Sequence, residues 1–161
     1  MLFGRRRFDP QPTAQAAVLL ATTGEPFSKA AIRRAHELAA GEPVAVLTIL
    51  KVYGSQFGLP NPGLLPTRRE REEQFTLMQR TIAALERRGS TVDGQIATTR
   101  SAGRTIAKVA RVRGVRYVVM DDREQTGVGR MVQGSVISTV RRRLASGTEL
   151  ELVAAPARPR P

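Results

Sequence analysis

The chain has 161 residues, of which 41% are hydrophobic, 4% are aromatic and none is cysteine. This length suits one domain with a buried core, no apolar run approaches the roughly 18 residues that span a bilayer, and thiol chemistry and disulfide scaffolds are excluded. The formal net charge is +12, and because Lys29, Lys51 and Lys108 are the only lysines, that charge comes almost entirely from arginine. An anionic partner would suit such a charge, but dispersed arginines with few aromatic side chains are also typical of an ordinary solvated surface.

The two ends of the chain lack apolar periodicity. Residues 1–14 contain three consecutive arginines and two prolines and predict a flexible basic arm, while residues 156–161, PARPRP, predict a disordered tail. The first segment has no apolar stretch of signal-peptide length, so we expect a cytoplasmic protein. The folded domain is therefore expected over residues 15–155.

Between these ends, strand-length apolar runs alternate with helical patterns. The runs are mostly continuous, as in strands of a parallel sheet that is covered on both faces; they are residues 16–21, 44–50, 92–97, 115–120 and 150–154. The predicted helices have N-cap residues or glycine stops at their ends; they start after Ser28, after Thr67, near Ala102 and at Ser135. Phe75, Met78, Ile82 and Leu85 are expected on the buried face of the second helix.

This order predicts an α/β fold, namely a five-stranded, mostly parallel sheet with helices on both faces and a Rossmann-like architecture. Ligands of such sheets bind at the carboxyl ends of the strands. The candidate binding loops are therefore residues 22–28, 51–66, 98–103 and 121–134. The loop 51–66 is long and rich in glycine and proline, which predicts a surface excursion or a lid.

Enzyme motifs are lacking in the sequence. There is no Walker A pattern, and no Gly-x-Gly-x-x-Gly follows the first strand. The single histidine, His36, is expected at the surface of the first helix and has no partners for a metal cluster or a catalytic triad. We therefore predict neither catalytic nor metal-binding residues.

Basic side chains gather in two places. Arg141, Arg142 and Arg143 lie near the end of the last predicted helix, where positive charge is favourable against the helix dipole. A second set recurs every three to four residues along the third helix and its entry: Arg100, Arg104, Lys108 and Arg111. A solvated face is the ordinary interpretation of this pattern, and a nucleic acid or another anionic surface is the alternative partner, although no DNA-binding motif accompanies the arginines.

The stretch DDREQTGVGRMVQGSV, residues 121–136, follows the apolar run VRYVVM and leads into the last amphipathic helix. This unit, within a five-stranded α/β domain, resembles the universal stress protein family over about residues 16–155. The resemblance implies the adenine nucleotide alpha hydrolase-like form of the fold. It also implies that ATP or another adenine nucleotide is the ligand to consider, because members that bind ATP carry Gly-x2-Gly-x9-Gly-Ser/Thr in this loop.

By this resemblance, the candidate nucleotide-binding residues lie at the ends of three strands and at the start of the last helix; they are Thr22, Thr23, Gly24, Ile49, Met120, Asp121, Gly134, Ser135 and Val136. Three positions depart from the pattern of the ATP-binding members. The first two glycines are replaced by Asp121 and Glu124, and Thr23 stands where those members have an aspartate. Ser135 has two interpretations, because it can be the N-cap of the last helix or a phosphate contact.

The acidic substitutions can be compared with the attraction of a helix N-terminus. Such a terminus favours a phosphate by roughly 0.3 to 2 kcal/mol. A carboxylate about 5 Å from a phosphate charge costs on the order of 3 kcal/mol at an effective dielectric constant near 20. Repulsion therefore exceeds attraction, unless an arginine or a divalent cation neutralises the carboxylates.

These observations predict a non-enzymatic stress-response or regulatory domain with a degenerate nucleotide loop and weak or absent ordinary ATP binding. The alternatives are an ATP- or AMP-binding member of the family, and a protein that binds nucleic acid or an anionic surface through its basic residues. The resemblance further implies a homodimer through the last strand, about Glu149 to Ala154. Exposed strand edges invite such pairing.

Overall fold

A computed structural model describes residues 13–52, 65–123 and 128–155 of the chain. The predicted arm and tail fall almost entirely outside these ranges, as do most of the predicted lid and the middle of the loop that follows the fourth strand. Within the described residues, no helix is both long and apolar enough to cross a membrane.

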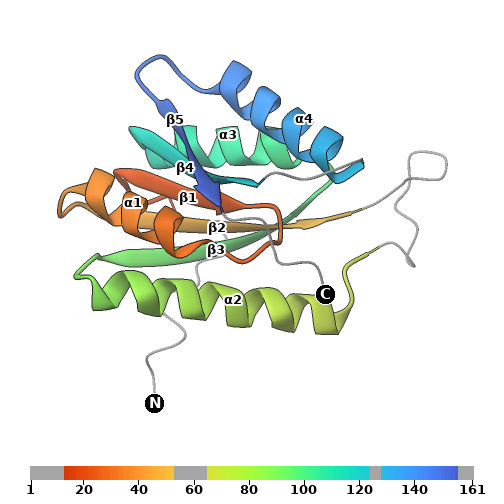
Figure 1. Ribbon diagram of the computed structural model, residues 1–161, viewed down its shortest axis with the longest axis horizontal. Helices are drawn as coiled ribbons and strands as arrows, with labels where there is room; N and C mark the ends of the chain where they lie inside the picture. Colours follow the sequence, from red (N-terminus) through yellow and green to blue (C-terminus); the bar gives the residue numbers. More distant parts are fainter. Residues whose placement is uncertain (1–12, 53–64, 124–127, 156–161) are drawn as a thin grey trace.

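Strands and helices alternate strictly along the chain (Figure 1). The strands are β1 (Val18–Thr22), β2 (Val44–Lys51), β3 (Val92–Thr99), β4 (Tyr117–Arg123) and β5 (Glu149–Ala155). The helices are α1 (Lys29–Ala39), α2 (Arg68–Arg87), α3 (Ala102–Arg113) and α4 (Val128–Arg143). The predicted element order is confirmed, and the largest difference in bounds concerns β4 and α4.

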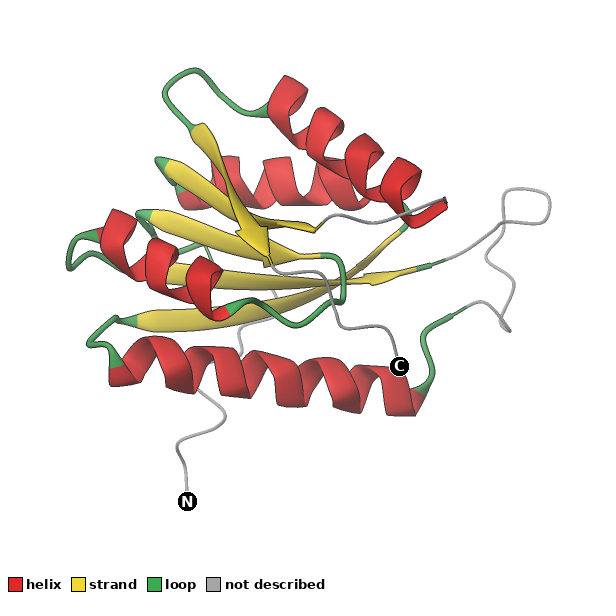
Figure 2. Ribbon diagram, in the orientation of Figure 1, coloured by secondary structure: helices red, strands yellow, loops and turns green. Residues whose placement is uncertain are grey.

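The five strands form one sheet in the order β3-β2-β1-β4-β5, and all four strand pairings are parallel. Helices α1 and α2 cover one face of the sheet, and α3 and α4 cover the other (Figure 2). The predicted α/β fold with helices on both faces is therefore confirmed. The strand order starts at β1 and grows outward in both directions, as in other doubly wound sheets.

Each face of the sheet has its own apolar core, which explains why the strand sequences are continuously hydrophobic. Along β1, Leu19 and Ala21 pack under α3 and α4, whereas Val18 and Leu20 pack under α1 and α2. Successive side chains of a strand point to opposite faces, so a strand that is covered on both sides needs apolar residues at every position.

Helix ends largely follow the sequence signals. Ser28 caps α1 by accepting a hydrogen bond from the Ala31 amide at 3.0 Å, and Thr67 forms a capping box with Glu70 at the start of α2.

The prediction that Phe75 belongs to the buried face of α2 is wrong, because its exposed fraction is 42%. That face is completed instead by Thr81, whose hydroxyl donates to the Leu77 carbonyl within the helix.

Helices α3 and α4 approach each other closely at Gly103. A Cβ atom at this position would lie 2.7 Å from Thr139 Cβ and 3.1 Å from the Val136 carbonyl oxygen. Only glycine leaves room for this contact, which fixes the position of α4 over the sheet.

At the opposite end of α3, Arg113 is 1% exposed and forms a two-pronged ion pair with Asp93 of β3. Its Nε atom also donates to the Ala14 carbonyl at 2.5 Å. A buried guanidinium needs such a full set of acceptors. Residue 14, the last of the predicted arm, is therefore attached to the domain.

Candidate functional site

The carboxyl ends of β1 and β4 lie side by side at the point where the strand order changes direction (Figure 1). In open parallel sheets this is the position where ligands bind. Two of the segments predicted as binding loops, residues 22–28 and 121–134, begin at these two strand ends.

The β1 side of this crevice is tightly organised. The Thr22 hydroxyl donates to the Glu25 carbonyl at 2.7 Å, so it is already occupied within the loop. Gly24 has a φ angle of +98°, which side-chain-bearing residues rarely adopt, and its carbonyl accepts a hydrogen bond from Gln74 of α2 at 2.9 Å. Thr23, which stands in the place of the family aspartate, is partly exposed.

Asp121 does not point freely into the crevice. Its carboxylate accepts hydrogen bonds from the Ser28 amide at 2.8 Å and from the Ser28 hydroxyl at 2.5 Å. The N-terminus of α1 thus holds an anion that belongs to the protein itself. Although 93 residues separate Asp121 from Ser28 in the sequence, the topology brings them together because α1 starts beside the end of β4.

The β4 side differs from the sequence prediction. Residues 121–123 continue β4 and pair with Val153, Ala154 and Ala155 of β5. Helix α4 begins at Val128, so the prediction that it begins at Ser135 is wrong. The local sequence does not explain this start, because VGRMVQ contains Gly129 and two valines besides Arg130, Met131 and Gln133. The physical reason is that residues 121–123 pair with β5, which shortens the connection between β4 and α4, and Gly134 is tolerated inside the helix at a cost of about 1 kcal/mol.

This early start changes the roles of Gly134, Ser135 and Val136. All three lie inside α4, where backbone amides bond to carbonyls one turn earlier, rather than at a helix terminus with free amides. Ser135 is exposed and is not the N-cap. Val136 is buried in the core under α3 and α4.

Two other candidate residues also serve the core. Ile49 is 1% exposed and Met120 is 4% exposed, and both belong to the apolar cluster under α3 and α4. Their side chains therefore pack against the protein itself.

A small cavity of about 160 Å³ opens at the carboxyl ends of β1 and β2. It brings together Thr23, Gly24 and Ile49 of the candidate set, and α2 contributes Glu70, Glu73 and Gln74. Ligand pockets are typically about 300 to 1,000 Å³. This cavity is too small for a nucleoside triphosphate, and the two carboxylates at its wall oppose a polyanion.

A larger groove of about 760 Å³ lies between the β1–α1 loop and α2. It shares Gly24, Glu73 and Gln74 with the small cavity. Asp121, Ser135 and Val136 are not among the described residues that line it.

The sequence reasoning missed the contribution of α2. Gln74, Glu70 and Glu73 contact or line the candidate site, yet they lie in a helix whose charged face reads as solvent-exposed. Gln74 donates to Gly24 while its own Oε1 atom is buried without a partner among the described residues. The available signal was Gln74 itself, a polar residue at the boundary between the charged face of α2 and the apolar face that packs on the sheet.

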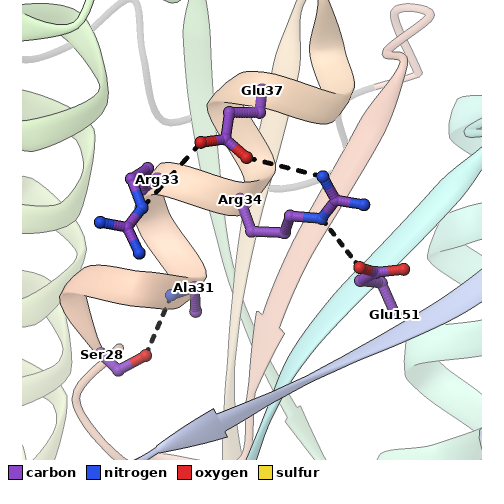
Figure 3. Close-up of polar contacts among 6 residues, drawn as sticks. All are labelled: Ser28, Ala31, Arg33, Arg34, Glu37 and Glu151. Carbon is purple, nitrogen blue, oxygen red and sulfur yellow. Dashed lines mark hydrogen bonds and ion pairs between the residues drawn. The ribbon is translucent and has the colours of Figure 1, made fainter.

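On the far side of α1, charged residues connect this helix to β5 (Figure 3). Arg34 Nε donates to Glu151 at 2.8 Å, and a second guanidinium nitrogen lies 3.5 Å from Glu37. The hydrogen bond to Glu151 raises the pKa of Arg34, with further contributions from the charges of Glu151 and Glu37. Arginine is protonated at all ordinary pH values, so this pKa shift does not change its charge. The contacts form an exposed brace between α1 and β5.

His36 is half-buried, and its Nδ1 atom lies 2.6 Å from the Ser90 hydroxyl, so the prediction of a plain surface residue is wrong. The contact joins α1 to the loop before β3, away from the crevice. In the part of the chain that the structure describes, no three His, Asp or Glu side chains are grouped so that they could hold a metal ion.

A family model described as "Universal stress protein family" matches residues 16–145. None of the curated proteins matches the chain.

Several solved structures share the fold. A universal stress protein from Archaeoglobus fulgidus in complex with dAMP has 15% sequence identity and a TM-score of 0.59, with 85% of this chain and 96% of that chain covered. A universal stress protein in complex with cAMP has 17% identity and a TM-score of 0.61, with coverage of 88% and 98%. A family member from Burkholderia pseudomallei has 19% identity and a TM-score of 0.61, with coverage of 87% and 97%.

Proposed function

Because the chain belongs to the universal stress protein family, we propose that it is a non-enzymatic regulatory domain of this family that does not bind ATP in the ordinary manner. It would act through partners, with the carboxyl-end crevice kept as a scaffold. Two family structures carry dAMP and cAMP, so adenine nucleotides are the ligands against which this proposal must be tested.

The observation that carries the proposal is the state of Asp121. This residue replaces the first glycine of the ATP-binding pattern, and its carboxylate already occupies the amide and hydroxyl of Ser28. A triphosphate placed here would meet a fixed negative charge, which costs on the order of 3 kcal/mol at about 5 Å.

Two further observations support it. Gly134 and Ser135 lie within α4, so they offer no helix terminus to a phosphate. The cavity beside Thr23 and Ile49 has a volume of only about 160 Å³.

The test is a calorimetric titration of the purified protein with ATP, AMP and cAMP, each with and without Mg²⁺. We expect no saturable binding of ATP up to about 1 mM, which corresponds to a binding free energy weaker than about −4 kcal/mol. Saturable binding with a micromolar Kd would contradict the proposal.

A pair of double variants separates two possible causes of weak ATP binding. One is repulsion by the two carboxylates, and the other is the loss of glycines that would let the backbone come close to a phosphate. Asp121→Gly with Glu124→Gly restores the glycine pattern, whereas Asp121→Asn with Glu124→Gln removes the same two charges but keeps the side chains. ATP binding by both variants would identify repulsion as the cause. Binding by the glycine variant alone would identify close backbone approach, and binding by neither would locate the defect at Thr23 or in the early start of α4.

We also propose that the domain forms a homodimer through β5. In the sheet order this strand lies at an edge and pairs only with β4 among the described residues, while Leu150 and Leu152 are only partly buried. Sedimentation equilibrium is expected to give twice the chain mass at micromolar concentrations. A monomer at all concentrations would exclude this interface.

A further inference from the structure

Helices α3 and α4 contain no acidic residue. The sequence of α3 is AGRTIAKVARVR and that of α4 is VGRMVQGSVISTVRRR. Among the side chains that the structure describes, the exposed cations of α3 are Arg104, Lys108 and Arg111, and those of α4 are Arg141, Arg142 and Arg143; Arg100, just before α3, is also exposed. We call these seven residues the α3/α4 basic face.

The opposite layer is different, because it contains glutamates that pair with several of its cations. In α1, Arg33 and Arg34 lie within 4 Å of Glu37. In α2, Arg68 and Arg69 each pair with a glutamate one turn later at 2.9 Å. Among the described residues, no ion pair involves a member of the α3/α4 basic face.

The basic residues share one surface because both helices cover the same face of the sheet (Figure 2). They touch where Gly103 meets Thr139. Both helices precede parallel neighbouring strands, so they run in the same direction. The contact of Gly103 with Thr139 places the end of α4 beside the first turn of α3. Arg104 directly follows Gly103, so it lies on the turn of α3 that is beside the end of α4, where the three arginines follow Thr139.

The spacing along α3 suits a chain of phosphates. Arg104, Lys108 and Arg111 follow an i, i+4, i+7 pattern, so they lie on one stripe that is about 10 Å long at 1.5 Å per residue. The exposed outer side of α4 adds the hydroxyl groups of Ser135 and Ser138, and serine is a common donor to phosphate oxygens.

From these observations we propose that the α3/α4 basic face binds the phosphate backbone of double-stranded nucleic acid without sequence specificity. Guanidinium groups bind phosphate through paired N–H donors, and six of the seven cations are arginines. Single-stranded nucleic acid is disfavoured because α3 and α4 contain no aromatic residue on which bases could stack. Insertion into a membrane is disfavoured because Val112 is the one exposed large apolar residue described on these helices.

Binding is tested by fluorescence anisotropy with labelled duplexes of about 25 base pairs, one of DNA and one of RNA, from about 50 to 200 mM salt. For the native chain we expect binding at low salt, a similar Kd for unrelated sequences and a steep loss of affinity as salt rises. Each phosphate contact contributes about −0.9 to the slope of log K against log salt. Arg104→Gln with Lys108→Gln and Arg111→Gln should therefore make the slope shallower by about 3.

The matched control removes the same charge from the other face. Arg68→Gln, Arg69→Gln and Arg71→Gln also lower the net charge by three, and all three side chains are exposed on α2. This variant should keep nearly the full salt slope, because a local surface and not the total charge holds the duplex.

Three results would overturn the proposal. They are no binding of either duplex at about 50 mM salt, an equal loss in both triple variants, and binding to vesicles rich in phosphatidylserine without binding to duplexes. Preference for one duplex type would retain the proposal and identify the nucleic acid.

Discussion

The two sides of the carboxyl-end crevice agree with the sequence prediction to different extents. The β1 side keeps its expected form, with Ser28 capping α1 and the loop 22–28 tied by local hydrogen bonds. On the β4 side, residues that were predicted to form a loop belong to a strand and a helix instead, because β4 extends to Arg123 and α4 begins at Val128. The difference shows that one side of a crevice can keep its predicted form while the other side departs from it within the same fold.

The largest expected effect concerns the packing that fixes α4. Gly103→Val places side-chain atoms where Thr139 and the Val136 carbonyl already lie within 3.1 Å of the Cβ position. Overpacking of this kind costs typically 1 to 3 kcal/mol, and we expect about 3 kcal/mol in urea unfolding. Lys108→Val, at an exposed site of the same helix, is the control and should cost about 0.5 kcal/mol from helix propensity alone. Equal losses would mean that the close contact does not hold the β4 side in place.

The link between the two sides comes next. Ser28→Ala removes both the cap of α1 and one hydrogen bond to Asp121, so we expect a loss of about 2 kcal/mol in the free energy of unfolding. A double-mutant cycle with Asp121→Ala isolates the contact and should give a coupling of about 1 to 2 kcal/mol. Additive losses would show that the Ser28 hydroxyl does not contact the Asp121 carboxylate in solution, since the hydrogen bond from the Ser28 amide remains in Ser28→Ala.

Gln74→Met tests the tether from α2 to the β1 loop. It removes the hydrogen bond to Gly24 but also a buried oxygen that has no described partner. These effects oppose each other, so the net cost should stay below about 1 kcal/mol. Faster amide exchange in residues 22–28 with little change in global stability is the expected signature. A loss of several kcal/mol would make this contact central to the fold.

The smallest effect is expected at the brace between α1 and β5. Glu151→Gln breaks an ion pair whose partner Arg34 is well exposed, and exposed pairs contribute little. The urea midpoint should not move measurably, at low or at high salt. A clear salt-dependent loss would show that this brace, and not the crevice contacts, connects the outer strand to the domain.

The element order was predictable because continuous apolar runs and capped amphipathic helices are local signals. The runs at Val18 and Val44 and the caps at Ser28 and Thr67 depend on residues that lie within a few positions of each other. The contact of Asp121 with Ser28 was not predicted, because it depends on which strands are neighbours in the sheet.

The start of α4 was missed for a different reason. Gly-Ser is a strong sequence sign of a helix N-terminus, and Gly134 with Ser135 matched both that sign and the family resemblance. In the structure the pairing of residues 121–123 with β5 shortens the connection, and the helix then begins before the glycine. Tertiary pairing therefore outweighed a local signal, and the predicted phosphate contacts moved into the helix.

Amide hydrogen exchange of residues 132–137, followed by mass spectrometry with and without Mg²⁺ and ATP, shows whether this segment is a helix or a nucleotide-binding loop. If the phosphate loop has become part of α4, these amides exchange slowly, as in a hydrogen-bonded helix, and ATP does not change their rates. Fast exchange at Gly134 and Ser135 that slows on adding ATP would contradict the account, because it would reveal a free loop that closes on a bound nucleotide.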